Sequence, residues 1–117
     1  MATQEHDQWR YLIIWEFRVR PGMEGRFEEG YGPRGEWAQF FSRSEGYVKT
    51  ELNHDLKDSR RYVTLDFWES REAYENFRQQ QAAEYGALDQ KFEELTEKEL
   101  EIGKFERIRE RSELGEC

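Results

Sequence analysis

Few side chains in this sequence could carry proton-transfer chemistry. The chain has two histidines, His6 and His54, and His54 stands between Asn53 and Asp55 at the end of a predicted strand. A neighbouring carboxylate can tune an imidazole towards neutral pH, which makes His54 one candidate general base. The simpler interpretation is a solvated loop histidine, so His54 becomes a catalytic candidate only if it faces a pocket.

Asp66 is the second candidate base, because it alternates with bulky residues along another predicted strand. If its side chain faces the interior, burial would raise its pKa and favour proton abstraction. We favour the alternative, in which Asp66 forms a structural ion pair with Arg18 or Arg61. Two phenols, Tyr62 and Tyr85, are further candidates as hydrogen-bond donors to a substrate oxygen.

Aromatic side chains could form the walls of a slot for a planar ligand, since flat apolar walls with few polar groups are typical of small-molecule sites. The alternative is that these side chains only fill the core. Trp37 is the better site candidate, because it follows a glycine-rich break that could move as a lid. Trp68 closes a strand–helix corner, which is a packing role. The predicted pocket residues are Trp15, Trp37, Phe41, Tyr62, Trp68, Phe77 and Tyr85.

No metal site is expected from the sequence. Two separated histidines and one terminal cysteine, Cys117, lack the ligand spacing of a structural zinc site, and Cys117 allows no internal disulfide. P-loop, dinucleotide-binding glycine, HExxH and CxxC motifs are absent from the sequence. We interpret a set of acidic residues as one solvated helix face: Glu84, Glu93, Glu94, Glu97 and Glu99.

Composition limits the class of protein. The 117 residues suit one domain, and 38% charged residues with a mean hydropathy of -1.12 lie near the border of disorder. The 15% aromatic content argues instead for a folded core of few, large side chains. A net charge of -8 with interleaved basic residues disfavours nucleic acid. The longest apolar run, residues 12–15, is too short to span a membrane, and the lone cysteine favours a cytoplasmic location.

Hydrophobic periodicity predicts the elements that position these side chains. Apolar residues alternate along residues 11–19, from Tyr11 to Val19. Strands are expected at 11–19, 47–55, 61–68 and about 99–108. Helices are expected at about 21–31, 36–43 and 70–95, the last with a bend at Gly86. The order βαββαβ predicts an α+β, ferredoxin-like domain with a four-stranded antiparallel sheet over residues 10–108, between flexible termini at 1–9 and 109–117.

The strands at 11–19 and 61–68 carry apolar residues on both faces. In a ferredoxin-like fold the helices cover only one face of the sheet. A second copy of the chain would cover the other face, so we expect a homodimer through the sheet faces, a dimeric α+β barrel. The alternative is a monomer with an unusually apolar sheet face.

Three segments carry a resemblance to a known family: FRVRPGME at 17–24, GYV at 46–48 and FWESREAY at 67–74. Together they resemble the antibiotic biosynthesis monooxygenase domain of the dimeric α+β barrel superfamily, over about residues 10–106. The resemblance implies a homodimer with a pocket between sheet and helices in each subunit. Known members include cofactor-free oxygenases of polycyclic phenols, quinol monooxygenases and haem-degrading enzymes.

The haem-degrading branch uses an asparagine, a tryptophan and a histidine whose corresponding positions here are Trp15, Phe77 and Ala87. None of the three matches, and no histidine follows His54 to bind the iron. The resemblance therefore implies chemistry without haem, and no bound cofactor is expected.

Three functions remain open from the sequence. The first is a cofactor-independent monooxygenase in which a small phenol, quinol or polyketide-like substrate is deprotonated in a dry pocket and reacts with O2. The second is a non-catalytic module for small-molecule binding or stress response, and the third is an isomerase or decarboxylase of polyketide-like rings. A pocket filled by Trp15, Trp37 and Phe41 would favour the second. An open pocket with two or more polar groups would favour catalysis, the candidates being Asn53, His54, Tyr62, Asp66 and Tyr85.

Overall fold

The chain forms a sheet layer and a helix layer, described for residues 8–108 by a computed structural model. The strands are β1 (Tyr11–Val19), β2 (Tyr47–His54), β3 (Arg61–Trp68) and β4 (Thr96–Glu106). The helices are α1 (Glu24–Tyr31), α2 (Glu36–Phe41), α3 (Arg71–Gln80), α4 (Ala82–Phe92) and the short 3-10 helix η2 (Glu93–Leu95).

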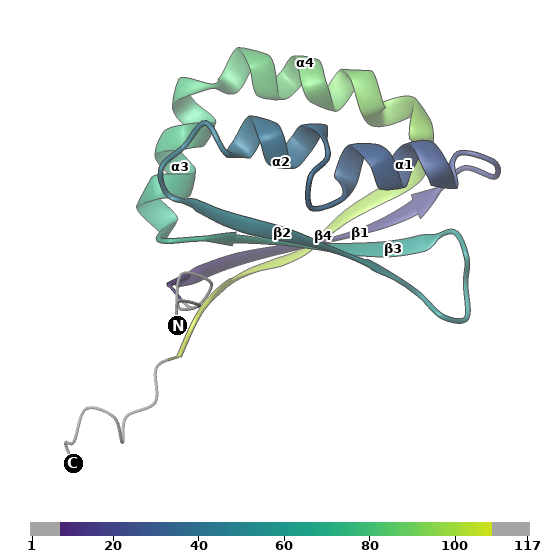
Figure 1. Cartoon of the computed structure of the whole chain (residues 1–117), viewed down its shortest axis with the longest axis horizontal. Coiled ribbons are helices and arrows are strands. Elements are labelled where there is room, and N and C mark those ends of the chain that lie inside the picture. The colour runs from purple at the N-terminus through teal and green to yellow at the C-terminus, as the bar shows by residue number, and fades with distance from the viewer. Residues whose placement is uncertain (1–7, 109–117) are drawn as a thin grey trace.

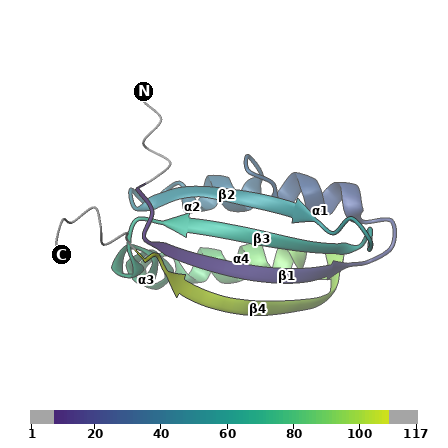
Figure 2. The ribbon, with the colours of Figure 1, turned by 90° about the horizontal axis from the view of Figure 1, so that it is seen from below.

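The four strands pair antiparallel in the order β2-β3-β1-β4. All the labelled helices lie on one side of this sheet (Figure 1), and the opposite side is open in the view from below (Figure 2). The predicted α+β, ferredoxin-like fold with a four-stranded antiparallel sheet is confirmed. No helix in the described part of the chain is long and apolar enough to cross a membrane.

The predicted alternation positions the core on the helix side of the sheet. Tyr11, Ile13, Phe17 and Val19 of β1 are buried on this side, and Trp15 lies half-buried among them. The alternate residues of β1 are half-buried on the other side. The inward residues of β3 are buried in the same way: Tyr62, Thr64, Asp66 and Trp68. Aromatic rings fill most of this layer, so a few large side chains provide the core that the composition predicted.

Tyr47 lies on the helix side of β2, although a strict alternation along the strand would place it on the open face with Lys49. Tyr47 pairs with Trp68 and Lys49 pairs with the next residue of β3, so Val48 is the extra residue of a β-bulge. The bulge turns the Tyr47 ring onto the Trp68 ring, with 5.4 Å between ring centroids. It also brings the Tyr47 hydroxyl to Thr50.

The long helix predicted at 70–95 is two helices that meet at Gln81, and the predicted bend at Gly86 does not occur. Gln81 leaves the helical conformation, with φ -113° and ψ 27°, while its backbone N–H still donates to Phe77. The break lets α3 and α4 pack in different directions. α3 buries Tyr74 and Phe77, whereas α4 carries Phe92 to the surface of α1.

β4 begins at Thr96 rather than near residue 99, because the helix ends in η2 and Thr96 pairs at once with Val19 of β1. β4 ends at Glu106, so Ile108 lies beyond the strand, and the prediction that it falls inside is wrong. Glu97 and Glu99, interpreted from the sequence as part of a helix face, are therefore strand residues.

The open face of the sheet carries large apolar side chains. On β4, Leu100 and Phe105 are 49% and 44% exposed, and Leu12 and Ile14 of the neighbouring β1 are half-buried. The expected flexible termini fall mostly outside the described residues. Trp9, which belongs to the predicted flexible segment 1–9 and is described, packs edge-on against Phe67 at 5.0 Å between ring centroids.

Candidate functional site

A narrow pocket lies between the helix side of the sheet and the helices. Its strand walls are Trp15, Phe17, Thr50, Thr64, Asp66 and Glu99, and its helix walls are Tyr31, Trp37, Phe41, Tyr85 and Asp89. The cavity itself has a volume of about 40 Å³, and the empty space reaches about 410 Å³ when the solvent at its mouth is included. The cavity therefore holds water-sized groups, and a ring-sized ligand must widen it.

Asp66 is the buried charged group of this pocket. It is 8% exposed, and burial raises the pKa of its carboxyl to about 7. Its Oδ1 accepts a 2.7 Å hydrogen bond from Thr50 Oγ1, which acts in the opposite direction and stabilises the carboxylate. No described residue donates a hydrogen bond to Oδ2, so this oxygen is available to a ligand. A carboxyl that exchanges its proton near neutral pH suits a general base.

Tyr47 extends this hydrogen-bond chain away from the pocket. Its hydroxyl donates to Thr50 Oγ1 over 2.7 Å. Because Tyr47 supplies that proton, the hydroxyl hydrogen of Thr50 is directed to Asp66. Burial raises the pKa of Tyr47 to about 12, so the phenol remains a donor at neutral pH.

Two more phenols, Tyr31 and Tyr85, stand in the pocket wall. Burial raises the pKa of both well above the ordinary value, so both stay protonated. The Tyr85 ring is covered by the Arg78 guanidinium, 3.8 Å from the ring centroid. The pKa of Tyr85 is also raised by the charge of Asp66, which indicates that the two groups act on the same region of the pocket.

Two acidic residues, Asp89 of α4 and Glu99 of β4, form the rim of the pocket. Both residues are partly exposed to solvent, and the carboxyl group of Glu99 also lies partly within the pocket lining. Burial raises the pKa of Glu99, and the negative charge of Asp89 raises it further. The rim therefore brings two like charges close enough to repel each other.

The model of the family described as antibiotic biosynthesis monooxygenase matches residues 10–87. The chain belongs to this family. No curated protein matches the sequence itself. A mutant of SnoaB, a cofactor-independent oxygenase from Streptomyces nogalater, matches the structure with a TM-score of 0.70 at 20% identity, covering 86% of this chain and 94% of SnoaB.

Two further solved structures share the fold of this chain. A putative antibiotic biosynthesis monooxygenase from Bordetella bronchiseptica has a TM-score of 0.66 and 22% identity, and covers 86% of this chain and 99% of its own. A Pseudomonas aeruginosa protein has a TM-score of 0.61 and 15% identity, over 86% and 96% of the two chains. At these identities the comparisons establish the fold and leave the reaction to the site itself.

In this chain, the pocket brings together five residues that the sequence analysis predicted for a functional site. These are Trp15, Trp37, Phe41, Asp66 and Tyr85. The predicted pocket residues Tyr62, Trp68 and Phe77 are not among its walls. Trp68 and Phe77 pack behind Phe41, and Tyr62 lies under α1, where its hydroxyl donates to Glu28.

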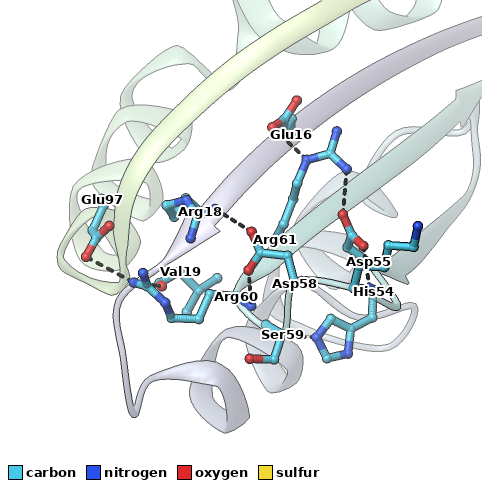
Figure 3. A network of polar contacts seen from close by, with 11 residues as sticks. Glu16, Arg18, Val19, His54, Asp55, Asp58, Ser59, Arg60, Arg61 and Glu97 are labelled. Carbon is cyan, nitrogen blue, oxygen red and sulfur yellow. Dashed lines mark hydrogen bonds and ion pairs between the residues drawn. The ribbon is translucent and has the colours of Figure 1, made fainter.

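His54 lies outside the pocket, at the end of β2 beside the β2–β3 turn (Figure 3). Its ring stacks on Tyr62 at 4.3 Å, and its Nε2 pairs with the backbone oxygen of Ser59 at 2.8 Å. The side chain is exposed to solvent. The structure therefore gives His54 the loop role that the sequence analysis offered as the simpler interpretation.

The ion pair favoured for Asp66 on sequence grounds does not form. Arg18 instead pairs with Asp58, and Arg61 pairs with both Glu16 and Asp55 (Figure 3). The period of two in a strand explains this difference, since Arg18 and Arg61 project from the open face while Asp66 projects towards the helices. The buried alternative for Asp66 is the one that the structure contains.

Several pocket residues were missed by the sequence analysis. Thr50 lies on the inward face of its strand, but its role depends on the register that aligns it with Asp66. Phe17 and Thr64 follow the same alternation that positions Trp15 and Asp66. The missed wall residues are Phe17, Tyr31, Thr50, Thr64, Asp89 and Glu99.

The part of the chain that the structure describes contains no ready set of metal ligands. No group of three or more His, Cys, Asp or Glu side chains is arranged there to hold an ion. Asp66, Asp89 and Glu99 share one pocket, but they do not form such a group.

Proposed function

We propose that this protein is a cofactor-independent oxygenase that acts on a small phenolic or quinol-type ring, with Asp66 as the general base. One observation carries the proposal: a carboxyl with a pKa of about 7 stands, almost completely buried, in the wall of an aromatic pocket. SnoaB, a relative in fold, is an oxygenase of the same cofactor-independent class. Of the residues that the sequence offered as bases, Asp66 alone lines the pocket.

The reaction needs no external reductant. Asp66 takes a proton from an acidic C–H or O–H group of the substrate, and the resulting anion reduces O2 and forms a C–O bond with it. The peroxide takes the proton back and loses water, which leaves a new carbonyl. One ring methylene and one O2 thus give one carbonyl and one water. The protein contributes a base, an environment poor in water and phenol donors that stabilise the anion.

Polar groups and aromatic walls meet in this pocket, so both sequence criteria are partly satisfied. Asp66 and Tyr85 provide the two polar candidates that favour catalysis. Trp15, Trp37 and Phe41 also line the pocket and leave a cavity of only about 40 Å³. Trp15 and Tyr85 are the partly exposed aromatic walls, so we infer that they move when a ring enters.

A small-molecule binding module without catalysis is the second candidate function. The narrow cavity favours it, because a site that must widen for its ligand holds no ring in a fixed reactive position at rest. The two functions differ in whether the bound ring consumes O2.

The homodimer belongs to the same proposal. The open face of the sheet carries Leu100 and Phe105, and a second sheet is a partner of matching shape. Around this apolar area the charged residues of the open face are already paired, such as Arg61 with Glu16 and Asp55. Paired charges can be covered by a second copy at a smaller desolvation cost than free charges.

Oxygen consumption tests the proposed function. Anthrones and substituted hydroquinones are supplied to the purified protein, and O2 consumption and product formation are both measured. We expect one O2 per ring oxidised without hydrogen peroxide, and loss of at least about 100-fold in rate for Asp66→Asn. Asp55→Asn is the matched control, since Asp55 lies on the other side of the sheet. Binding of the same rings without O2 uptake would support the binding module instead.

A further inference from the structure

The pocket carries negative charge that no group in its walls balances. Asp66 lies in its depth, and Asp89 and Glu99 lie on its rim. No lysine, arginine or histidine belongs to the walls. Among the described residues, neither Asp89 nor Glu99 takes part in an ion pair, whereas the other surface clusters of the chain are largely paired.

The basic groups nearby are committed to other partners. Arg78 covers the Tyr85 ring from outside the walls and donates to the Tyr74 hydroxyl over 3.1 Å. In the neighbouring groove between α2 and α4, Arg43 pairs with Glu84 and Lys91 pairs with Glu36. Arg78 is thus the cation that acts on this region, where it also interacts with Asp89. One cation does not neutralise three carboxyl groups.

We propose that this pocket selects uncharged or positively charged phenols and excludes rings that carry a carboxylate or a sulfonate. The inference rests on the proposed ligand pocket and names the substrate class of that pocket. An anion entering between Asp89 and Glu99 would lose water and meet two like charges, and it would find no cation in the walls. A neutral ring escapes this penalty, and an ammonium group is attracted.

The acceptors of the pocket suit the same class of ligand. Ionised carboxylates only accept hydrogen bonds, so Asp89 and Glu99 on the rim are matched by hydrogen-bond donors on the ligand. Asp66 Oδ2 adds a buried acceptor that no described residue uses, since Thr50 donates to Oδ1. Phenol O–H and amine N–H groups match these acceptors. The walls also hold donors, namely the Tyr31 and Tyr85 hydroxyls and the Trp37 indole N–H, which has no partner among the described residues. A ligand carboxylate is therefore opposed by the charges of the pocket and not by a lack of donors.

Three ring probes of nearly equal size separate charge from shape: 4-hydroxybenzyl alcohol, 4-hydroxybenzylamine and 4-hydroxybenzoate. Their dissociation constants are measured by NMR titration at about pH 8, with the indole signals of Trp15 and Trp37 as reporters in the walls. We expect the amine to bind at least as tightly as the alcohol, and the benzoate about tenfold more weakly than the alcohol. Added salt should reduce that ratio, because screening weakens charge and leaves shape unchanged.

The double variant Asp89→Asn/Glu99→Gln should bring the benzoate to within about threefold of the alcohol. The matched control is Glu45→Gln/Glu69→Gln, which makes the same change in net charge at two exposed positions outside the pocket. Equal binding of benzoate and alcohol by the unchanged protein overturns the inference. The inference is also overturned if the rim variant leaves the ratio of the benzoate and alcohol dissociation constants unchanged, or if none of the three probes binds.

The selectivity and the oxygenase proposal can fail separately. If the protein discriminates the probes by charge but consumes no O2, the selectivity is supported and the oxygenase proposal is rejected. O2 uptake from carboxylated rings as fast as from their neutral analogues removes the selectivity alone.

Discussion

Thr50 and Asp66 face each other directly across β2 and β3, and the Thr50 hydroxyl donates to Asp66 Oδ1 over 2.7 Å. This contact fixes the orientation of a carboxyl group that is otherwise surrounded by aromatic rings. Burial favours the neutral acid, and the hydrogen bond favours the carboxylate, so the pKa reaches about 7 rather than a higher value. The balance between these two effects makes the group useful near neutral pH.

The buried carboxyl of Asp66 should make the protein less stable as pH rises. An ordinary aspartate has a pKa of 3.8, and burial raises the pKa of Asp66 to about 7, so the folded state holds the proton more tightly than the unfolded chain. Stability contributed by the protonated form is complete below about pH 4 and is lost progressively up to about pH 7, by at most about 1.4 kcal/mol per pH unit. Urea unfolding between pH 4 and 8 measures this slope, which Asp66→Asn should remove.

Asp55→Asn is the control for this slope, because the pKa of Asp55 is lowered by the Lys57 backbone N–H and by Arg61. Its carboxylate stabilises the fold fully above about pH 4, so Asp55→Asn should lower stability by a similar amount throughout pH 4–8 and leave the slope unchanged. An Asp66→Asn variant that follows the pH dependence of the unchanged protein would contradict the burial of that carboxyl.

Thr50→Val tests the hydrogen bond that holds Asp66. The substitution keeps the branched shape and removes the hydroxyl, so the pKa of Asp66 should rise above about 7. Because Tyr47 also loses its acceptor, the free energy of unfolding should fall by about 1–3 kcal/mol. Carboxyl carbon NMR measures the titration, and O2 uptake should shift to higher pH with it. Tyr47→Phe, which leaves the Thr50 hydroxyl in place, should change the Asp66 titration less.

The inward positions of β1 and β3 are predictable because burial on one face imposes a period of two that is written in the sequence. This alternation is enough to identify Trp15 and Asp66 as candidates. Applied to the arginines, the same alternation excludes Arg18 and Arg61, which project from the open face, but it does not identify which residue of the neighbouring strand lies opposite Asp66. Only the register between β2 and β3 decides that Thr50 is the partner.

Three features depend on tertiary packing that the local sequence does not specify. Gln81 ends a helix without a glycine or proline, because α3 and α4 pack against different parts of the core. The bulge at Val48 turns Tyr47 inwards, and a simple alternation assigns Tyr47 to the wrong face. The early start of β4 makes Glu99 a pocket residue, where a run of glutamates suggested a helix surface.

Gly30 should be essential to the contact between α1 and α4. A Cβ at this position would lie 2.5 Å from the Phe92 ring, which is buried. Gly30→Ala should therefore lower the free energy of unfolding by about 1–3 kcal/mol, as overpacking does elsewhere. Gly25 lies in the same helix with nothing within 4 Å of its Cβ position, so Gly25→Ala should be stabilising by about 0.5–1 kcal/mol. Equal effects of the two substitutions in urea unfolding would contradict the close packing of Phe92.

The apolar strip on β4 should hold two copies of the chain together. Phe105 pairs with Leu12 across the strands, so both side chains project from the open face of the sheet, where Phe105 is 44% exposed. Light scattering should give about twice the chain mass of 14.3 kDa. Phe105→Glu would bury a charge against the second sheet and should weaken association by about 2 kcal/mol or more, at least about thirtyfold in Kd.

Leu56→Glu is the control for this substitution, because Leu56 is fully exposed in the turn between β2 and β3. It introduces the same charge in place of an apolar side chain at a position outside the β4 strip, so the mass should stay that of a dimer. A mass of 14.3 kDa for the unchanged protein would exclude the dimer. A dimer that survives Phe105→Glu but not Leu56→Glu would move the interface from the open face to the β2–β3 turn, since the charge would then disrupt contacts made there.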